Sequence, residues 1–129
     1  MKQHFSHSWR ASKQPRKQIK YRANAPLHLK YKFMASHLSP ELRKKHGKRA
    51  IEVRKEDRVK IMRGQFKGVS GKIERVDLKK TKVYLKGAET TKKDGSKTFY
   101  PLHPSNLMIL ELNLSDKKRL NALNRGSKK

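Results

Sequence analysis

Residues 57–87 read DRVKIMRGQFKGVSGKIERVDLKKTKVYLKG and combine two short strands with a basic, glycine-rich turn. Apolar and polar side chains alternate in Val59-Lys60-Ile61 and in Val83-Tyr84-Leu85, a period of two that sends successive residues to opposite faces of a strand. Between them, residues 63–72 place three glycines within eight residues, beside cations and one phenylalanine. Because glycine permits tight turns and close approach to the backbone, this turn is typical of polyanion binding.

The same alternation continues through residues 51–112 and predicts a small β barrel. Closing a sheet on itself limits the exposed edges that invite aggregation, and about 60 residues suffice for such a core only marginally. Asp94-Gly95 lies between strand-like runs and predicts a tight hairpin loop. The five expected strands centre on Val59/Ile61, Gly71/Ile73 with Val76 after a bulge, Val83/Leu85, Phe99 with Leu102, and Leu107/Ile109.

The charge of the chain indicates a polyanionic partner. Its 129 residues carry a formal charge of +25, so the compact state repels itself until a polyanion neutralises it. Residues 1–50 hold 14 basic and one acidic residue, residues 51–112 hold 15 and eight, and residues 113–129 hold six and one. We therefore expect a basic N-terminal extension with two short helices over 1–50, the barrel over 51–112, and a basic C-terminal helix and tail over 113–129.

Outside the barrel, short helices and one extended arm are expected. Residues 1–23 hold seven cations without apolar periodicity, which predicts an extended arm that is either a solvated tail or a contact for the polyanionic partner. A helix is expected to start at Asn24 or Ala25 before Pro26. A second helix follows Ser39-Pro40-Glu41 and stops at Gly47, and Ser115 is expected to cap a helix over residues 116–123.

Composition argues against several classes of protein. No apolar run approaches the roughly 20 residues that span a bilayer, and no secretory signal is found, so we expect a cytoplasmic protein without membrane insertion. The chain has no cysteine, which excludes disulfides and thiolate metal sites. His4 and His7 supply two ligands where a metal site needs three or four, and no nucleophile, base and acid form a set. We expect no metal, cofactor, small-molecule substrate or catalysis.

The residues around Gly71 resemble the KOW motif, a strand-loop-strand element of SH3-like barrels in ribosomal and transcription-elongation proteins. With three flanking segments, in the same order, they are similar to the archaeal and eukaryotic branch of the large-subunit ribosomal protein L-twenty-four family over most of residues 12–119. The short turn Gly68-Val69-Ser70-Gly71 favours the archaeal form. The flanking segments are Ser12-Lys13-Gln14-Pro15-Arg16-Lys17 with Asn24-Ala25-Pro26-Leu27-His28, Leu38-Ser39-Pro40-Glu41-Leu42-Arg43, and His103-Pro104-Ser105-Asn106 with Leu112-Asn113-Leu114-Ser115-Asp116-Lys117.

This resemblance implies an SH3-like barrel with basic extensions, a structural constituent of the large ribosomal subunit. It further implies binding to the 5′ domain of the large-subunit rRNA, contact with neighbouring large-subunit proteins, a role early in assembly and a position near the peptide tunnel exit. A KOW module of a transcription elongation factor that contacts RNA polymerase is the alternative, and a general nucleic-acid-compacting protein is a third class. Glu52, Glu56 and Lys86 depart from the family's usual Pro, Gly and acidic residue.

The candidate RNA contacts are the cations, the glycine-rich turn and the His103 segment. Two interpretations of the turn are open. In one, its cations contact phosphates and Phe66 stacks on an exposed base; in the other, it is an ordinary barrel turn and Phe66 packs inward. The segment that begins at His103 either binds RNA or links two strands. The acidic residues Glu52, Glu56, Asp57, Glu74 and Asp77 are expected to pair with Lys and Arg around the barrel. The expected RNA-binding residues are Arg10, Lys13, Arg16, Lys17, Lys20, Arg22, His28, Lys30, Lys32, Arg43, Arg54, Lys60, Arg63, Gly64, Phe66, Lys67, Gly68, Gly71, Lys72, Lys79, Lys80, His103, Ser105 and Asn106.

Overall fold

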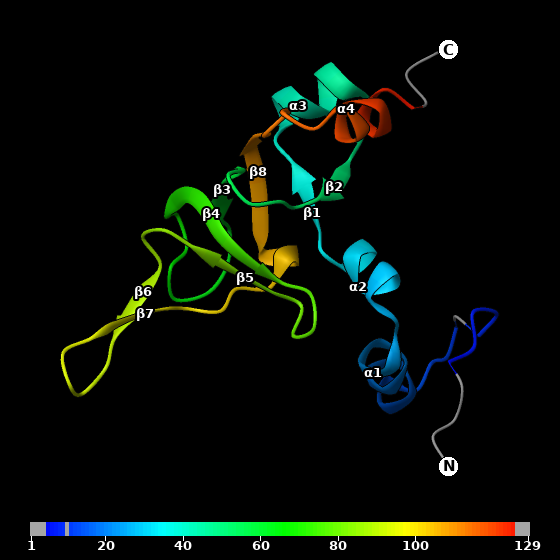
Figure 1. Cartoon of the computed structure of the whole chain (residues 1–129), viewed down its shortest axis with the longest axis horizontal. Coiled ribbons are helices and arrows are strands. Elements are labelled where there is room, and N and C mark those ends of the chain that lie inside the picture. Colours follow the sequence, from blue (N-terminus) through cyan, green and yellow to red (C-terminus); the bar gives the residue numbers. More distant parts are fainter. Residues whose placement is uncertain (1–4, 10, 126–129) are drawn as a thin grey trace.

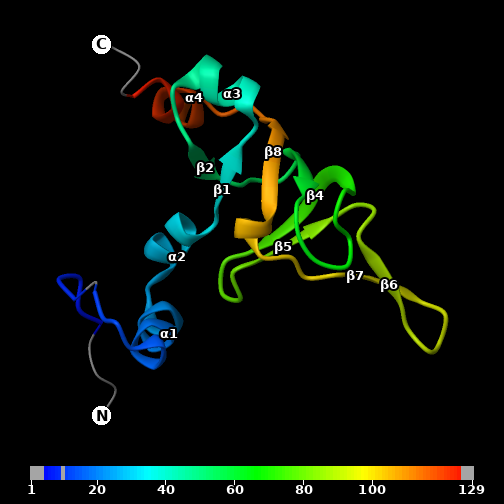
Figure 2. The same cartoon turned by 180° about the vertical axis from the view of Figure 1, so that it is seen from behind.

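The computed structural model of the chain describes residues 5–9 and 11–125, and within them short helices flank a central sheet (Figure 1). The helices α3 and α4 lie together at one end of the molecule, while α1 and the hairpin β6–β7 project in different directions (Figure 2). The elements are α1 Pro15–Asn24, α2 Leu27–Phe33, β1 Ala35–Leu38, α3 Pro40–His46, β2 Ala50–Glu52, β3 Arg58–Ile61, β4 Ser70–Asp77, β5 Lys82–Leu85, β6 Glu89–Thr91, β7 Lys97–Phe99, a 3-10 helix Pro104–Asn106, β8 Leu107–Glu111 and α4 Lys117–Asn124.

The central sheet has six strands in the order β2-β1-β8-β3-β4-β5. Only β1 and β8 run parallel, and the other neighbours are antiparallel. The mainly β core is as expected, but the closed barrel is not found, because among the described strands β2 and β5 end the sheet. Phe99 lies in β7, which pairs with β6 in a separate two-stranded sheet instead of closing the first one. An isolated bridge joins Val83 to Leu102 beside β5.

The core is formed mainly by the central sheet, and residues beside α2 and in α4 complete it. The alternating positions Val59 and Ile61 of β3 are fully buried, as the period of two predicts. Met34 at the end of α2 and Leu123 of α4 are buried in the same cluster. Through Leu123, α4 therefore packs against the core. The expected division after residue 50 falls within β2.

Several local sequence signals are confirmed. The register of β4 against β5 shifts between Ile73 and Arg75, where the bulge was expected. Ser39 caps α3 by accepting a hydrogen bond from the amide of Leu42, and Gly47 ends that helix with φ of +62°. The expected cap of α4 is one residue too early, because Asp116, not Ser115, accepts from the amide of Lys118.

The extended arm expected over residues 1–23 is wrong for its second half, which forms α1. The lack of apolar periodicity is real, because α1 buries no residue. The helix forms nevertheless because Pro15 occupies its first turn and the following Arg, Lys, Gln and Ala have high intrinsic helix propensity. The strands β1 and β2 were not expected either. They depend on long-range pairing, with Leu38 opposite Ile109 and His37 opposite Ala50.

Two of the expected acid–base pairings are found. Asp57 is fully buried and forms an ion pair with Arg119, and Glu74 lies 3.3 Å from the ammonium of Lys86. The side chain of Asp77 instead accepts a hydrogen bond from the amide of Lys80, 3.1 Å away, and shapes the turn between β4 and β5.

Glu56 has a backbone conformation that favours glycine, with φ of +73°. Replacing Glu56 by Gly should therefore stabilise the fold by about 1 kcal/mol, because a left-handed residue with a Cβ costs roughly 1–2 kcal/mol, part of which is offset by the greater freedom of Gly in the unfolded chain. Chemical denaturation measures the difference. Lys55→Gly is the matched control, because the described non-glycine residues with positive φ are Glu56 and Thr81. Equal destabilisation by both substitutions would contradict the expectation.

Candidate nucleic-acid interface

The glycine-rich turn between β3 and β4 is tight and exposes its cations. The amide of Gly68 donates to the carbonyl of Ile61 over 2.8 Å, and both Gly64 and Gly68 have positive φ. The cations of this turn, Arg63 and Lys67, together with Lys72 on β4, are exposed. The turn can therefore present positive charge and bare backbone to a phosphate chain.

Phe66 in this turn is half-buried and packs against the core cluster. Its ring centroid lies 5.2 Å from that of Tyr100, with the planes tilted by 57°. This contact accounts for the phenylalanine by packing alone. Stacking of Phe66 on a base stays a prediction for the part of the ring that remains exposed.

Gly71 has an intramolecular reason to be glycine. It lies in β4 opposite Val59, and a Cβ built on it would be 2.4 Å from the backbone oxygen of Lys86. The chain beyond β5 crosses so closely that no side chain fits between. The sequence predicted close backbone approach at Gly71, and the backbone that approaches in the structure is the chain's own.

The helices α1 and α2 carry a dense set of cations. Among the described residues of α1 there is no acidic side chain, and Arg16, Lys17, Lys20 and Arg22 are all exposed. Arg10 lies outside the described residues. The other expected contacts on this side of the molecule, Lys13, His28, Lys30 and Lys32, are exposed or half-buried.

A groove of about 530 Å³ brings three of the predicted groups together, Arg22, Lys80 and His103. Arg22 of α1 faces the turn after β4, and His103 completes the wall from before the 3-10 helix. No carboxylate lines it, and Thr81 on its rim has φ of +55°, a rare conformation for a β-branched residue. The groove is therefore a cationic cleft. Its lining residues are Gln18, Tyr21, Arg22, Phe33, Lys80, Thr81, Lys82 and His103.

The segment that begins at His103 has a clear structural function. His103 caps the 3-10 helix, because its Nδ1 accepts a hydrogen bond from the amide of Ser105 at 3.2 Å. The same nitrogen lies 2.7 Å from the hydroxyl of Ser105. The buried hydroxyl of Ser36 donates to the carbonyl of Pro104, and the carbonyl of Asn106 accepts from the amide of Met62. This network supports the structural alternative, while RNA contact through the exposed Ser105 stays a prediction.

Some of the expected RNA-binding side chains are engaged within the protein. Arg54 pairs with Asp116 and lies 3.4 Å from the hydroxyl of Tyr31, and these hydrogen bonds raise its pKa. Arg43 donates from Nε to the carbonyl of Leu38. Because Arg54 contacts both Asp116, the N-cap of α4, and Tyr31 of α2, it holds these two helices near each other. Lys60, which is half-buried on β3, and Lys79, which is exposed in the turn after β4, complete the expected set.

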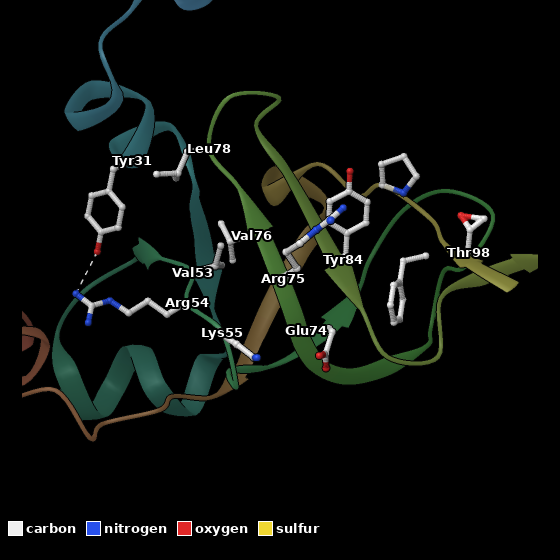
Figure 3. A pocket seen from close by; sticks show the side chains of 12 residues that line it. Tyr31, Val53, Arg54, Lys55, Glu74, Arg75, Val76, Leu78, Tyr84 and Thr98 are labelled. Carbon is white, nitrogen blue, oxygen red and sulfur yellow. Dashed lines mark hydrogen bonds between the residues drawn. The ribbon is translucent and has the colours of Figure 1, made fainter.

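A second groove, of about 970 Å³, was not anticipated from the sequence; residues of β4 and β5 line it together with residues 53–55 and 98–101 (Figure 3). The guanidinium of Arg75 lies over the ring of Tyr84, 4.3 Å from its centroid. Lys55 and Glu74 also line this groove. The signal that could have found Arg75 is its place beside the bulge of β4, where bulges redirect side chains.

Comparison with known proteins identifies the family of the chain. Residues 12–126 match the family of ribosomal proteins that comprises the eukaryotic L26 proteins and their archaeal L24 counterparts. The large ribosomal subunit protein uL24 of Methanosphaera stadtmanae is 50% identical over 114 residues, which cover 88% of this chain and 97% of that protein. The chain belongs to this family of ribosomal proteins. The resemblance noted in the sequence is confirmed, and this ribosomal protein is not an enzyme.

The family match also bears on the alternatives. The match spans residues 12–126 and so includes α1, the central sheet and α4, well beyond the glycine-rich turn between β3 and β4. Within the described part of the chain, no group of three or more His, Cys, Asp or Glu is placed to hold a metal ion. No described helix is long and apolar enough to cross a membrane.

The ribosomal protein should lose stability in mild acid through His103. Burial, followed by the charges of Lys82 and Arg22, lowers the pKa of His103 below its usual 6.5. The unfolded chain therefore binds more protons than the folded one as pH falls through about 6.5 toward the folded pKa, so stability is full above this window and declines within it. Protonation of Nδ1 also removes the acceptor for the amide of Ser105. Melting temperatures from pH 7.5 to 5, at fixed ionic strength, measure the decline.

The control for this pH dependence is His103→Asn, which keeps an oxygen that can cap the 3-10 helix and removes the titration. It should decline less steeply than the parent protein. A remaining slope is expected because burial also lowers the pKa of His37 and His46. An unchanged slope in His103→Asn would show that His103 does not carry the effect.

Proposed function

We propose that this protein is a structural constituent of the large ribosomal subunit, in the cytoplasm, and that it binds large-subunit rRNA. The observation that carries the proposal is the cationic groove, where Arg22, Lys80, Lys82 and His103 meet and no acidic residue contributes to the lining. These residues come from separated parts of the chain, so the fold gathers positive charge that the sequence disperses. The Methanosphaera relative is a large ribosomal subunit protein, which supports the assignment to that subunit.

RNA recognition by this surface is a matter of shape and charge. The major groove of A-form RNA is too narrow for side chains, so phosphates, 2′-hydroxyls and unstacked bases are the targets. The groove and the exposed cations of α1 serve the phosphates, and the turn around Gly64 and Gly68 offers exposed backbone. Neutralisation by rRNA also relieves the self-repulsion of a chain with a formal charge of +25.

The fold supports a finer assignment. We propose that β3, the glycine-rich turn and β4 form a KOW motif, and that β3, β4, β5 and β8 are the strands of an SH3-like sheet whose closure is incomplete. The pairing of β3 with both β4 and β8, and the contact that makes Gly71 glycine, support this reading. By its family resemblance the protein binds the 5′ domain of the rRNA early in assembly, near the tunnel exit, beside other large-subunit proteins.

Deleting residues 1–23 should weaken binding to a transcript of the 5′ domain and flatten its salt dependence. The deletion removes seven cations, and each lost phosphate contact lowers the slope of log K against log salt by roughly 0.7 to 0.9. Filter binding between 50 and 300 mM KCl measures both quantities, with the transcript and duplex DNA of equal length compared in parallel. An unchanged slope would show that residues 1–23 do not contact the RNA. Equal affinities for the transcript and for duplex DNA would favour a general nucleic-acid-compacting protein.

A charge-matched pair of variants separates the surface from net charge. Lys13→Gln/Arg16→Gln/Arg22→Gln removes three cations on or beside α1, while Lys92→Gln/Lys93→Gln/Lys97→Gln removes three from the β6–β7 hairpin. The first variant should lower the slope by about 2 to 3, and the second should leave it close to the parent value. Equal losses would mean that RNA responds only to total charge and not to the proposed surface.

A further inference from the structure

An aromatic cluster joins the N-terminal segment to α1 and α2, apart from the main core. Tyr21 is at its centre, with its ring centroid 4.9 Å from that of Phe5, 5.6 Å from that of Trp9 and 6.4 Å from that of Phe33. None of these four residues belongs to the core cluster, and α1 contributes no buried residue to the fold. The rings therefore contact one another outside the main core, and packing of the core does not account for them.

The cluster surrounds a pocket of about 290 Å³, close to the lower end of the range of small-molecule sites. Trp9 is 36% exposed, so a large part of its indole remains accessible to a ligand. Lys17 and Asn24 stand on the wall with the three rings, and no carboxylate is among the lining residues. The pocket therefore offers flat apolar rings, an amide with both a donor and an acceptor, and positive charge.

We propose that this pocket binds one unstacked nucleobase of RNA. The base stacks on the indole of Trp9 beside Phe5 and Tyr21, its polar edge meets the amide of Asn24, and the adjoining phosphate lies near Lys17. This inference rests on the RNA binding proposed above and names the chemical group that one part of the surface recognises. Aromatic rings interleaved with lysines suit nucleotides, because every base has a face that stacks and every nucleotide has a phosphate that needs a cation.

The position of the pocket in the chain makes it a distinct site. Phe5, Ser6 and Trp9 precede residue 12, where the family match begins, so a large part of the lining lies outside the matched region. The cationic groove shares Tyr21 with this pocket, which places both on α1. A strand of RNA whose phosphates follow the groove therefore has a route along α1 to the aromatic pocket.

Trp9 is the sole tryptophan of the chain, so its emission reports on this pocket directly. The test titrates the full chain with a decamer of riboadenosine and with a decamer of the same phosphate backbone that lacks the bases. The base-bearing strand should quench Trp9 emission and bind about 5- to 150-fold more tightly than the abasic strand, the range expected for one stacked base. Equal affinities with unchanged emission at saturation would overturn the proposal.

A pair of variants extends the test to rRNA. Trp9→Leu should weaken binding of the 5′-domain transcript by the same factor and leave its salt slope unchanged, because no cation is lost. Phe99→Leu is the matched control, since Phe99 is 38% exposed in β7, away from α1, and it should bind like the parent. Because Trp9 emission is read in the parent chain, the conclusion stands even if the variant loses local structure.

The outcomes for the pocket and for the proposed function differ. Tight, salt-dependent binding of the transcript with no change in Trp9 emission contradicts the nucleobase pocket and leaves rRNA binding intact. Failure to bind the transcript at all contradicts the proposed function itself. A preference for the base-bearing strand that is lost in Trp9→Leu and kept in Phe99→Leu, when the anisotropy of labelled RNA is followed, supports the site.

Discussion

Replacing Arg119 by Met should lower the free energy of unfolding by about 3–5 kcal/mol, because it leaves the buried carboxylate of Asp57 without its cation. Both side chains are buried, at 2% and 0% exposure, and the pair is bidentate with both N–O distances at 2.6 Å. The same guanidinium donates to the carbonyls of Glu52 and Asn113. Arg119 thus ties α4 to β2 and to the segment after β8, and its loss should release α4 from the domain.

Urea denaturation followed by circular dichroism measures this loss, and the chain contains its own control. Arg58 and Glu111 form an exposed ion pair 3.2 Å apart, with more than half of the Glu111 side chain in solvent. Arg58→Met makes the same substitution at a solvated pair and should cost less than about 1 kcal/mol. If Arg119→Met costs no more than Arg58→Met, the buried pair does not hold the fold together.

Replacing Gly71 by Ala should cost about 3 kcal/mol, near the upper end of the cost of overpacking. The added Cβ would lie 2.4 Å from the backbone oxygen of Lys86. That oxygen cannot withdraw easily, because the amide of Lys86 donates to the carbonyl of Lys72 and holds the chain beside β4. The strand pairing at the end of β5 must therefore open to admit the methyl group.

The control for Gly71→Ala is Gly64→Ala, where the backbone conformation is unfavourable for alanine but a Cβ meets no other atom. Gly64 has φ of +98° but open space around a Cβ, so it tests backbone conformation without a steric clash. Its expected cost is about 1–2 kcal/mol, the penalty of a left-handed alanine. Thermal unfolding of both variants decides between the two effects. Equal costs, or a cheaper Gly71→Ala, would contradict the close approach of the two backbones.

The sequence predicted the elements that local chemistry determines. Alternation placed β3 and β5, the Ser39 cap and Gly47 bounded α3, and the bulge in β4 was expected from its pattern. It missed β1 and β2, whose short runs contain no alternation that stands out, and β1 depends on pairing with β8, which lies far along the chain. It missed α1 because periodicity reports a buried face, and α1 has none.

The candidate site was predicted in composition but not in arrangement. Cations on the arm and in the turns were identified by type, whereas their convergence with His103 depends on tertiary structure. The sequence does not reveal that Arg54 and Arg43 make hydrogen bonds within the protein. In the sequence, Arg119 is one of six cations in a basic C-terminal segment, and nothing local shows that it pairs with Asp57, 62 positions away.

The measurement that bears most directly on the proposed function is sedimentation of a native lysate through sucrose gradients at moderate and high salt, with this protein followed across the fractions by mass spectrometry. We expect the protein to stay with the large subunit after the high-salt wash, as a structural constituent bound to rRNA by many phosphate contacts. Migration with RNA polymerase that survives nuclease treatment, migration with DNA, or recovery free at the top of the gradient would contradict it.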